Sequence, residues 1–272
     1  MSNVVTWGQY LTKGVPTKRF LIGGNWKCNG SLASMKAVIE VLNRAGPLPV
    51  VSEVVIAVPD IHIAAAQALM REDIAIAAQD VGAQGAGAYT GEVTAQMLQD
   101  VGVNWTLTGH SERRIGFGFP GETSAVVAKK TLLAVNAGMS VILCIGESLA
   151  EREAGQTLAV CIAQLAPVVD MLKETDWRRV VIAYEPVWAI GTGKVATPQQ
   201  AEDTQREIRA WLASQAKLGL YTASKIRILY GGSVKGSNCR ELIACPNIDG
   251  FLVGGASLLP EFVDVIKSPL SL

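Results

Sequence analysis

The sequence predicts an α/β fold in which eight parallel strands close into a (β/α)₈ barrel, with helices on the outside. Eight short runs rich in β-branched residues alternate with longer amphipathic stretches, which is the pattern of repeated strand–helix units. Several runs, such as VVIAV, SVILCI and VVIAY, are apolar throughout, as is typical of parallel strands buried on both faces. The chain has 272 residues without a Pro-, Gly- or Ser-rich linker, and one such barrel takes about 250 residues.

The strands are expected at short apolar runs in regular succession. They are residues 20–25, 54–58, 74–78, 105–108, 140–145, 179–184, 226–230 and 250–253. Helical segments are expected between them at residues 32–44, 124–136 and 198–215, among others. The last of these begins with TPQQ, the pattern of a capping box with Thr197 as the cap and Pro198 in the first helical position.

An open, doubly wound sheet is the alternative arrangement of eight alternating units. Such a sheet usually carries the loop GxGxxG after its first strand. Here the first expected strand runs into GGNWK instead. The closed barrel is therefore favoured over the open sheet.

The composition narrows the classes of partner and cofactor. Basic and acidic residues balance at 24 each, and no run of like charges stands out, so neither nucleic acid nor a membrane surface is expected as a partner. No apolar run approaches the roughly 18 residues of a membrane span. The five cysteines are irregularly spaced and indicate free thiols in a reducing compartment. With only two histidines, no multi-histidine metal centre is expected.

The first nineteen residues differ from the rest of the chain. They contain no acidic residue and carry Lys13, Lys18 and Arg19. We expect residues 1–19 to be an extension, either flexible or a remnant of a targeting or added leader segment, and residues 20–272 to form a single barrel domain. The expected location is the cytoplasm, or a plastid or other organelle if the extension is a targeting remnant.

Polar residues follow several expected strands. In a (β/α)₈ barrel the active site forms at the carboxyl ends of the strands. The first strand leads into Asn25 and Lys27, the fourth into His110 and Glu112, and the sixth into Glu185. These side chains are therefore expected to converge on one mouth of the barrel.

Diglycine turns follow the last two expected strands, as GGS at residues 231–233 and GG at residues 254–255. Barrels often bind phosphate at these two loops through backbone N–H groups, and glycine lets the backbone approach the oxygens closely. One such turn would be explained by a tight strand–helix connection. Two turns at these strand ends favour a phosphate site.

Glu185 and His110 are the candidates for proton transfer. Glu185 lies between VVIAY and PVWAI, where burial would make its carboxylate a stronger base, and a structural acid paired with a cation is an equally weighted alternative. His110 precedes SER at the start of a helix, which disfavours a cationic imidazole and leaves a neutral hydrogen-bond donor. The alternative for His110 is a core histidine, whereas His62 has no comparable setting and is expected to be structural or exposed.

Lys27 is placed at the expected mouth, where a phosphate or a developing negative charge needs a cation. A surface lysine is the alternative. Glu112 is expected to form a salt bridge with Lys27 and not to act as a second base.

Six segments together resemble the signature segments of the triosephosphate isomerase family, in family order. They are GNWKCNG (24–30), TGHSERR (108–114), CIGE (144–147), AYEPVWAIGTG (183–193), YGGSV (230–234) and VGGASL (253–258). The resemblance covers residues 20–268 and implies a TIM barrel. It implies the interconversion of dihydroxyacetone phosphate and D-glyceraldehyde 3-phosphate through an enediolate, in glycolysis and gluconeogenesis.

The resemblance also assigns roles to the residues at the mouth. Glu185 would remove a proton from the carbon next to the carbonyl, while neutral His110 polarises the substrate oxygens; this pairing is the established account of the family and does not follow from spacing. Lys27 would supply positive charge and Asn25 would bind substrate. The backbone amides that would hold the phosphate are those of Gly191, Ser233, Gly254 and Gly255.

Three further expectations follow from the resemblance. Residues 186–196 would form a lid, because an enediolate phosphate exposed to water can eliminate phosphate. No metal or organic cofactor is expected, since one carboxylate and fixed donors serve both proton transfers. The loop at residues 79–92 would enter a second subunit, with Thr90 near the partner's active site, giving a homodimer or, as the alternative, a tetramer.

Other interpretations remain beside this one. The chain could be another phosphate-binding barrel, acting on an indole or a pentose phosphate, although such an enzyme would lack the combination of His110, Glu185 and the lid. It could also be an inactive barrel kept as a binding protein, since fold does not imply function. Cys28, beside Lys27, is either a thiol sensitive to modification at the dimer interface or an inert buried thiol.

Overall fold

The strands close into a barrel in chain order. The computed structural model describes residues 18–190 and 196–272. Each strand pairs in parallel with the next, and β8 pairs in parallel with β1, which confirms the predicted closed barrel. The strands are β1 (Phe20–Asn25), β2 (Ser52–Ala57), β3 (Ile74–Ala78), β4 (Trp105–Thr108), β5 (Ser140–Ile145), β6 (Val180–Tyr184), β7 (Ile228–Tyr230) and β8 (Gly250–Val253).

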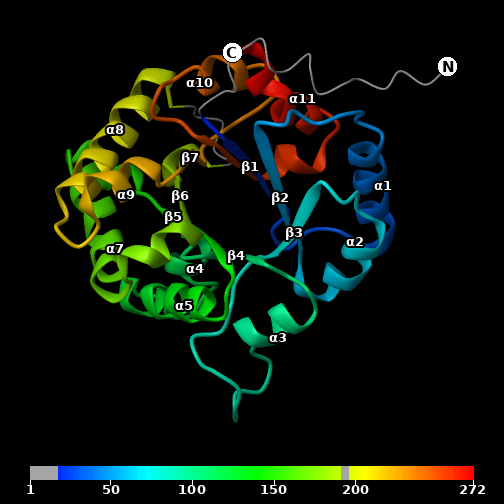
Figure 1. Cartoon of the computed structure of the whole chain (residues 1–272), viewed down its shortest axis with the longest axis horizontal. Coiled ribbons are helices and arrows are strands. Elements are labelled where there is room, and N and C mark those ends of the chain that lie inside the picture. The colour runs from blue at the N-terminus through cyan, green and yellow to red at the C-terminus, as the bar shows by residue number, and fades with distance from the viewer. Residues whose placement is uncertain (1–17, 191–195) are drawn as a thin grey trace.

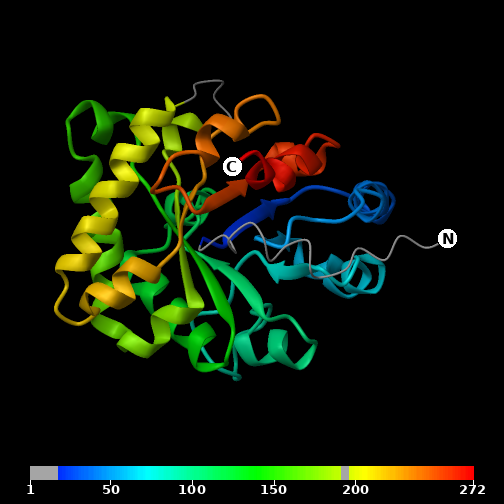
Figure 2. The same cartoon turned by 45° about the horizontal axis from the view of Figure 1, so that its top comes forward.

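Helices surround the strands on the outside, as Figures 1 and 2 show from two directions. They are α1 (Leu32–Asn43), α2 (Ile63–Leu69), α3 (Ala95–Asp100), α4 (Ser111–Ile115), α5 (Ser124–Asn136), α6 (Leu149–Glu153), α7 (Thr157–Met171), α8 (Pro198–Ser214), α9 (Gly219–Lys225), α10 (Cys239–Ile243) and α11 (Phe262–Lys267). Short 3₁₀ turns are η2 (Asp60–His62), η3 (Glu174–Arg179), η4 (Val187–Ala189), η5 (Gly255–Leu258) and η6 (Ser268–Ser271). Within the described part of the chain, none of these helices is long and apolar enough to cross a membrane.

The capping box predicted for α8 is present. The Thr197 hydroxyl accepts a hydrogen bond from the amide of Gln200 at 3.1 Å. The Gln200 side chain in turn accepts one from the amide of Thr197 at 2.9 Å. Pro198 occupies the first turn, where its missing N–H costs nothing.

Three strands differ from their predicted bounds. β2 begins at Ser52, before the apolar run, because Ser52 and Glu53 pair with the start of β1. β6 begins one residue late because Arg179 ends η3. β7 is shorter than predicted because Ile226 is the residue that ends α9, so the pairing with β6 starts only at Ile228.

Alternate side chains of the strands point to opposite sides of the barrel wall. One buried cluster is built only from strand residues of the barrel interior, including Leu21, Val55, Leu107 and Ile142. The intervening residues, such as Ile22, belong to a second cluster that joins the strands to the helices. Both faces of each strand are therefore buried, which explains why the strand sequences are apolar throughout. Each fully buried aliphatic side chain contributes about 1.5–3 kcal/mol.

The barrel closes where β8 meets β1. Leu21 lies opposite Gly250 in the register of this pair. Gly250 has φ of +136°, and a Cβ at this position would lie 1.9 Å from the carbonyl oxygen of Leu21. Only glycine fits here, so this residue determines how tightly the last strand approaches the first.

The loop between β3 and α3 leaves the barrel beyond the ring of helices, at the foot of Figure 1. Its base is held by a cluster of charged residues that are buried or half-buried. Asp80 Oδ2 lies 2.5 Å from Lys130 Nζ and 2.6 Å from Arg113 Nε, and both cations also contact Glu122. Burial nevertheless raises the pKa of Asp80 to about 6, an effect larger than the opposing attraction of Lys130.

The five cysteines are free thiols, as predicted. Cys28 is exposed in the single subunit, and Cys245 is half-buried. Cys144, Cys161 and Cys239 are buried. Burial raises the pKa of Cys144 well above that of an ordinary thiol, and the neighbouring Glu185 charge adds to the shift, so this thiol is neutral.

Candidate active site

A pocket of about 260 Å³ opens at the carboxyl ends of β1, β4, β6, β7 and β8. The strand ends bring together residues that are far apart in sequence, as the fold predicts. The pocket is lined by Asn25, Lys27, Asn29, His110, Glu185, Ile190, Gly231, Gly232, Ser233, Val234, Lys235, Leu252, Gly254, Gly255 and Ala256.

Glu185 directly follows β6 and its side chain is only 3% exposed. Its amide donates a 2.7 Å hydrogen bond to the carbonyl of Ile145, which fixes the backbone at this point. Its Oε2 accepts a long hydrogen bond, 3.5 Å, from the amide of Ser111. Among the described residues no lysine or arginine forms a salt bridge with this carboxylate, which argues against the alternative of a structural acid paired with a cation.

Glycines on the neighbouring strands make room for Glu185. A Cβ on Gly231 would lie 2.7 Å from Cγ of Glu185. A Cβ on Gly146 would lie 1.7 Å from the carbonyl oxygen of Glu185. Both glycines therefore position Glu185, and a side chain at either glycine would displace Glu185.

His110 is the residue that caps α4, and it is buried. Its Nδ1 accepts a hydrogen bond of 3.2 Å from the amide of Glu112. A ring nitrogen that accepts carries no proton, so the imidazole is neutral and its proton lies on Nε2. Nε2 lies 3.3 Å from Oε1 of Glu185. The pocket therefore contains a carboxylate and a neutral hydrogen-bond donor that point at each other.

Lys27 adopts a left-handed backbone conformation with φ of +51°, which is uncommon for a residue other than glycine. Two side chains hold it there. The Lys27 amide donates to Oδ1 of Asn25 at 2.9 Å, and its carbonyl accepts from Nε2 of Gln79 at 2.9 Å. Its Nζ forms a salt bridge of 2.7 Å with Glu112, as predicted, and its side chain passes close to Gly254.

The diglycine turns form the opposite wall of the pocket. A Cβ on Gly232 would lie 2.2 Å from the hydroxyl of Tyr230, so the turn can only be made with glycine. The Ser233 hydroxyl donates to the carbonyl of Ala189 at 3.0 Å, and its amide has no acceptor among the described residues. The turn η5 begins at Gly255, where the first amides of a helical turn lack a partner within it. This wall can receive an anion through backbone N–H groups.

The predicted site residues separate into three groups. Those that line one pocket are Asn25, Lys27, His110, Glu185, Ser233, Gly254 and Gly255. Glu112 and Thr90 do not line the pocket. Glu112 contacts Lys27 and His110, which do line it. Thr90 is exposed on the loop after β3. Gly191 lies outside the described residues, as do residues 192–195 of the predicted lid. His62, expected to be structural or exposed, is buried in η2.

Comparison with known proteins agrees with this geometry. A sequence model of the family "Triosephosphate isomerase" matches residues 20–269. The chain belongs to the triosephosphate isomerase family. It is accordingly an isomerase with the barrel characteristic of that family.

Individual relatives of this isomerase are similar over nearly their whole length. The triosephosphate isomerase of Paracoccidioides lutzii is 49% identical over 253 residues, covering 93% of this chain and 99% of the relative. That of Coprinopsis cinerea is also 49% identical over 253 residues, covering 93% and 98%. The relative from Oryza sativa subsp. japonica, named "Triosephosphate isomerase, cytosolic", is 46% identical over 252 residues, covering 92% and 97%.

Sequence reasoning missed several residues that line the pocket of this isomerase. Lys235 adds a cation at the rim near the diglycine wall, and Asn29 lies beside Lys27. A signal for Lys235 was present, because it comes two residues after GGS. Asn29 had no distinguishing signal beyond its place in the loop after β1.

Sequence reasoning also assigned no role to Glu147, which is fully buried after β5. Its Oε1 accepts hydrogen bonds from the Tyr184 hydroxyl at 3.2 Å and the Trp188 indole at 2.9 Å, and it forms a salt bridge of 3.1 Å with Arg152. This cluster attaches the segment after Glu185 to β5. The signal for it was a glutamate two residues after an apolar strand, a setting similar to that of Glu185, which directly follows one. Among the described residues, no group of three or more potential ligands could hold a metal ion.

Proposed function

We propose that this chain interconverts dihydroxyacetone phosphate and D-glyceraldehyde 3-phosphate in glycolysis and gluconeogenesis, with Glu185 and His110 as the proton-transfer pair. The observation that carries the proposal is the 3.3 Å approach of Glu185 Oε1 to His110 Nε2 inside a pocket walled by the two diglycine turns. The pocket is of a size for one small substrate. Family membership supplies the reaction, and this geometry supports the roles of the residues.

In the first step, the Glu185 carboxylate accepts a proton from the carbon next to the substrate carbonyl. The electron pair of the broken C–H bond forms the carbon–carbon double bond of an enediolate, and negative charge moves to the carbonyl oxygen. The Nε2–H of neutral His110 donates to that oxygen. A proton then moves between the two oxygens, and Glu185 returns a proton to the neighbouring carbon, so that the enzyme ends unchanged.

Lys27 and Asn25 stabilise the charge that develops in this sequence. Lys27 Nζ is held at the mouth by Glu112, at 2.7 Å, and is half-buried, so its charge is only partly screened by water. Asn25 accepts the Lys27 amide and thereby maintains the left-handed backbone that brings the lysine into the pocket. We propose that both side chains contact the substrate.

The substrate phosphate would lie against the diglycine wall. Its partners in the proposal are the backbone amides of Ser233, Gly254 and Gly255, with Gly191 as a fourth donor from beyond the described residues. The amide of Ser233, which has no acceptor among the described residues, supports this assignment. Lys235, at the rim, adds a positive charge for the same group.

The test is a steady-state assay of triose phosphate interconversion that compares the unmutated protein with Glu185→Gln. Removal of the base should lower kcat by about 10²–10⁴-fold, which is the usual contribution of a positioned general base. The exposed Glu207→Gln on α8 is a matched control and should keep full activity. A folded but inactive unmutated protein would support the inactive-barrel alternative, and equal activity in Glu185→Gln would show that another group is the base.

We further propose a homodimer built through the loop at residues 79–92, with Thr90 directed to the partner. Tyr89 in this loop is 49% exposed, and added Cβ atoms on Gly85 and Gly91 would meet nothing within 4 Å in a single subunit. A large aromatic side chain on a projecting, charge-poor loop favours a protein partner. Sedimentation at assay concentrations should give the mass of two chains, and a fully active monomer would contradict the proposal.

We also propose that residues 20–272 act as one barrel domain in the cytoplasm. The rice relative named as cytosolic supports this location. Fractionation of cells that produce the full chain should recover the activity with cytoplasmic markers. Recovery with an organelle would favour the targeting interpretation of residues 1–19.

A further inference from the structure

Arg114, in α4, connects three elements beside the active-site pocket. Its Nε donates a hydrogen bond of 2.7 Å to the carbonyl of Gly109, the residue that precedes His110. Its Nη2 donates to the carbonyl of Cys144 on β5 at 3.0 Å, and its Nη1 donates to the hydroxyl of Ser124, the first residue of α5, at 3.2 Å. One half-buried side chain therefore fixes the loop after β4 to both β5 and α5.

The fit between Arg114 and the loop after β4 is close. Gly109 has φ of +67°, and a Cβ at this position would lie 2.7 Å from Nη2 of Arg114 and 2.7 Å from the side chain of Val127. A side chain here would therefore displace the guanidinium. The same loop carries His110, whose Nε2 lies 3.3 Å from Glu185. The position of Arg114 is thus linked to the position of the imidazole.

β5 links Arg114 to Glu185 by a second route. The carbonyl of Ile145 accepts the 2.7 Å hydrogen bond from the Glu185 amide. The carbonyl of Cys144, the preceding residue, accepts from Arg114. The guanidinium and the Glu185 backbone are therefore attached to consecutive residues of one strand. Arg114 joins the loop that carries His110 to the strand that holds the Glu185 backbone.

The charge of Arg114 is not compensated by a direct ion pair. Within residues 18–190 and 196–272 Arg114 forms no salt bridge, and its hydrogen-bond acceptors are two carbonyls and a hydroxyl. Burial lowers the pKa of its guanidinium, while nearby acidic groups, Glu185 among them, act in the opposite direction. Arg114 and Glu185 therefore attract each other without direct contact.

The other cations of the pocket are less suited to stabilise the charge of Glu185. Lys27 forms a salt bridge of 2.7 Å with Glu112, so much of its charge is compensated. Lys235 is exposed at the rim, where water and salt screen it. Arg114 is half-buried and forms no salt bridge in the part of the chain that the structure describes, so its charge is screened less.

The uncharged groups around Glu185 cannot take this role. His110 is neutral, because its Nδ1 accepts a hydrogen bond. The thiol of Cys144 is neutral, because burial raises its pKa well above that of an ordinary thiol. The amide of Ser111 donates only a long hydrogen bond of 3.5 Å. These groups offer hydrogen bonds to the carboxylate but no net charge.

We propose that Arg114 is a positioning residue for the proton transfer: it fixes the loop of His110 against β5, and its charge favours the ionised form of Glu185. The inference rests on the function proposed above. Loss of the charge should leave Glu185 protonated up to a higher pH, where it cannot accept a proton from the substrate. Loss of the hydrogen bonds should let the loop of His110 move, which lowers kcat more than it changes KM.

The experiment compares the unmutated full chain with Arg114→Gln and Arg114→Lys. The Glu185 carboxylate is titrated by NMR after labelling with ¹³C-glutamate, and Glu185→Gln identifies its signal. Arg114→Gln loses the charge and should raise the pH of half-protonation by about one pH unit, which is about a tenfold change in proton affinity. Arg114→Lys keeps the charge and should raise it by less than about 0.3.

The kinetics of triose phosphate interconversion give a second readout. In Arg114→Gln the acid limb of the pH profile of kcat/KM should move upward by the same amount, and in Arg114→Lys it should stay in place. Both variants should lower kcat by about tenfold at the pH optimum, with KM changed by less than about twofold. The reason is that neither side chain can make all three hydrogen bonds of the guanidinium.

Arg179→Gln is the matched control. Arg179 is also half-buried and donates to a backbone carbonyl, that of Gly138, but at the amino ends of the strands. Its replacement should change neither the titration of Glu185 nor kcat. Circular dichroism and the unfolding midpoint establish that each variant is folded. If Arg114→Gln does not fold, Arg114→Lys decides, since a normal kcat or a displaced acid limb in that variant would contradict the proposal.

The two readouts separate this inference from the proposed function. A Glu185 titration that is the same in Arg114→Gln and in the unmutated protein would overturn the role of Arg114, even in a fully active isomerase. An unmutated protein that does not interconvert triose phosphates would contradict the proposed function instead. The NMR titration needs no activity, so it would still show whether Arg114 controls the charge of Glu185.

Discussion

Replacing Gly231 by alanine tests how strongly the catalytic rate depends on the position of the Glu185 side chain. An added Cβ would lie 2.7 Å from Cγ of Glu185, whereas carbon atoms are at their best separation at about 3.5–4.0 Å. The difference of roughly 1 Å must be taken up by movement, and the backbone resists it because the Gly231 amide donates a 2.8 Å hydrogen bond to Tyr184. Glu185 therefore moves. A displacement of about 1 Å costs about 10²-fold in rate, or about 2.7 kcal/mol.

The assay is steady-state isomerisation of triose phosphate, with kcat and KM measured separately. Gly231→Ala should lower kcat by about 10²-fold with little change in KM, because the amides proposed to hold the phosphate, those of Ser233, Gly254 and Gly255, are not themselves altered. Gly236→Ala, in the loop after the same strand, is the control. Its added Cβ would meet atoms only at ordinary distances of 3.5–3.6 Å, so full activity is expected. A kcat for Gly231→Ala within about threefold of normal would refute the reasoning.

Three other changes have defined outcomes. Gln79→Ala removes the donor that holds the carbonyl of Lys27 and should raise KM by about tenfold. An unchanged KM would show that Lys27 keeps its left-handed backbone without this hydrogen bond. Thiol titration of the native protein should label Cys28 rapidly and leave Cys144 unreacted until unfolding, and early labelling of Cys144 would contradict its burial. Asp80, with its pKa raised to about 6, binds a proton in the native state that the unfolded chain releases at lower pH, so its contribution to stability is greatest near pH 4 and declines as pH rises through 6. At fixed protein concentration, the unfolding free energy of the unmutated protein relative to Asp80→Asn should fall by about 2.4 kcal/mol between pH 4 and pH 7, and a pH-independent difference would argue against the raised pKa.

The sequence was sufficient for the barrel because both faces of each strand are buried. Runs such as SVILCI report that burial directly, since Ile142 contributes to the interior cluster and Leu143 to the outer one. The predicted bounds of a strand were wrong where neither a change in burial nor a turn residue marks its end in the sequence. Ser52 is polar and joins β2 only because β1 offers a partner at that register.

The site could be located from the sequence because parallel strands place their carboxyl ends on one side of the barrel. Glu185 and His110 could be found from their position after a strand. The contacts that orient them could not, because they join different strands. The Gln79 amide reaches the loop after β1, and Gly231 faces Glu185 across two neighbouring strands. Local sequence carries no information on such pairs before the register is known.

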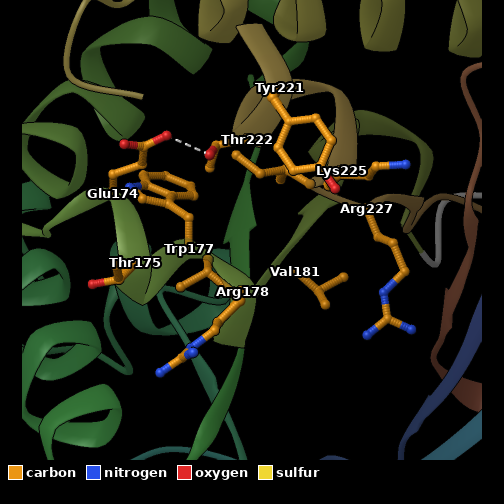
Figure 3. A pocket seen from close by; sticks show the side chains of 11 residues that line it. Glu174, Thr175, Trp177, Arg178, Val181, Tyr221, Thr222, Lys225 and Arg227 are labelled. Atoms are coloured by element: carbon orange, nitrogen blue, oxygen red, sulfur yellow. Dashed lines mark hydrogen bonds between the residues drawn. The ribbon is translucent and has the colours of Figure 1, made fainter. Parts of the chain in front are cut away.

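A cavity of about 390 Å³ lies between η3, α9 and the amino ends of β6 and β7 (Figure 3), and it could not be predicted from the sequence for the same reason. Arg178 and Tyr221 come from segments more than forty residues apart, and each taken alone is an ordinary exposed residue. Only the packing of η3 against α9 places these side chains around one space.

The pairing of β8 with β1 has a consequence for folding during synthesis on the ribosome. Synthesis proceeds from the N-terminus, and the wall that would hold the substrate phosphate includes Gly254 and Gly255, close to the end of the chain. Until Gly250 reaches Leu21, the sheet has two open edges, which can pair with other chains. A nascent or truncated chain therefore carries Glu185 and His110 without a closed site around them. Catalytic competence arrives in one step with the closing strand, so premature products are inactive and exposed to aggregation and proteolysis.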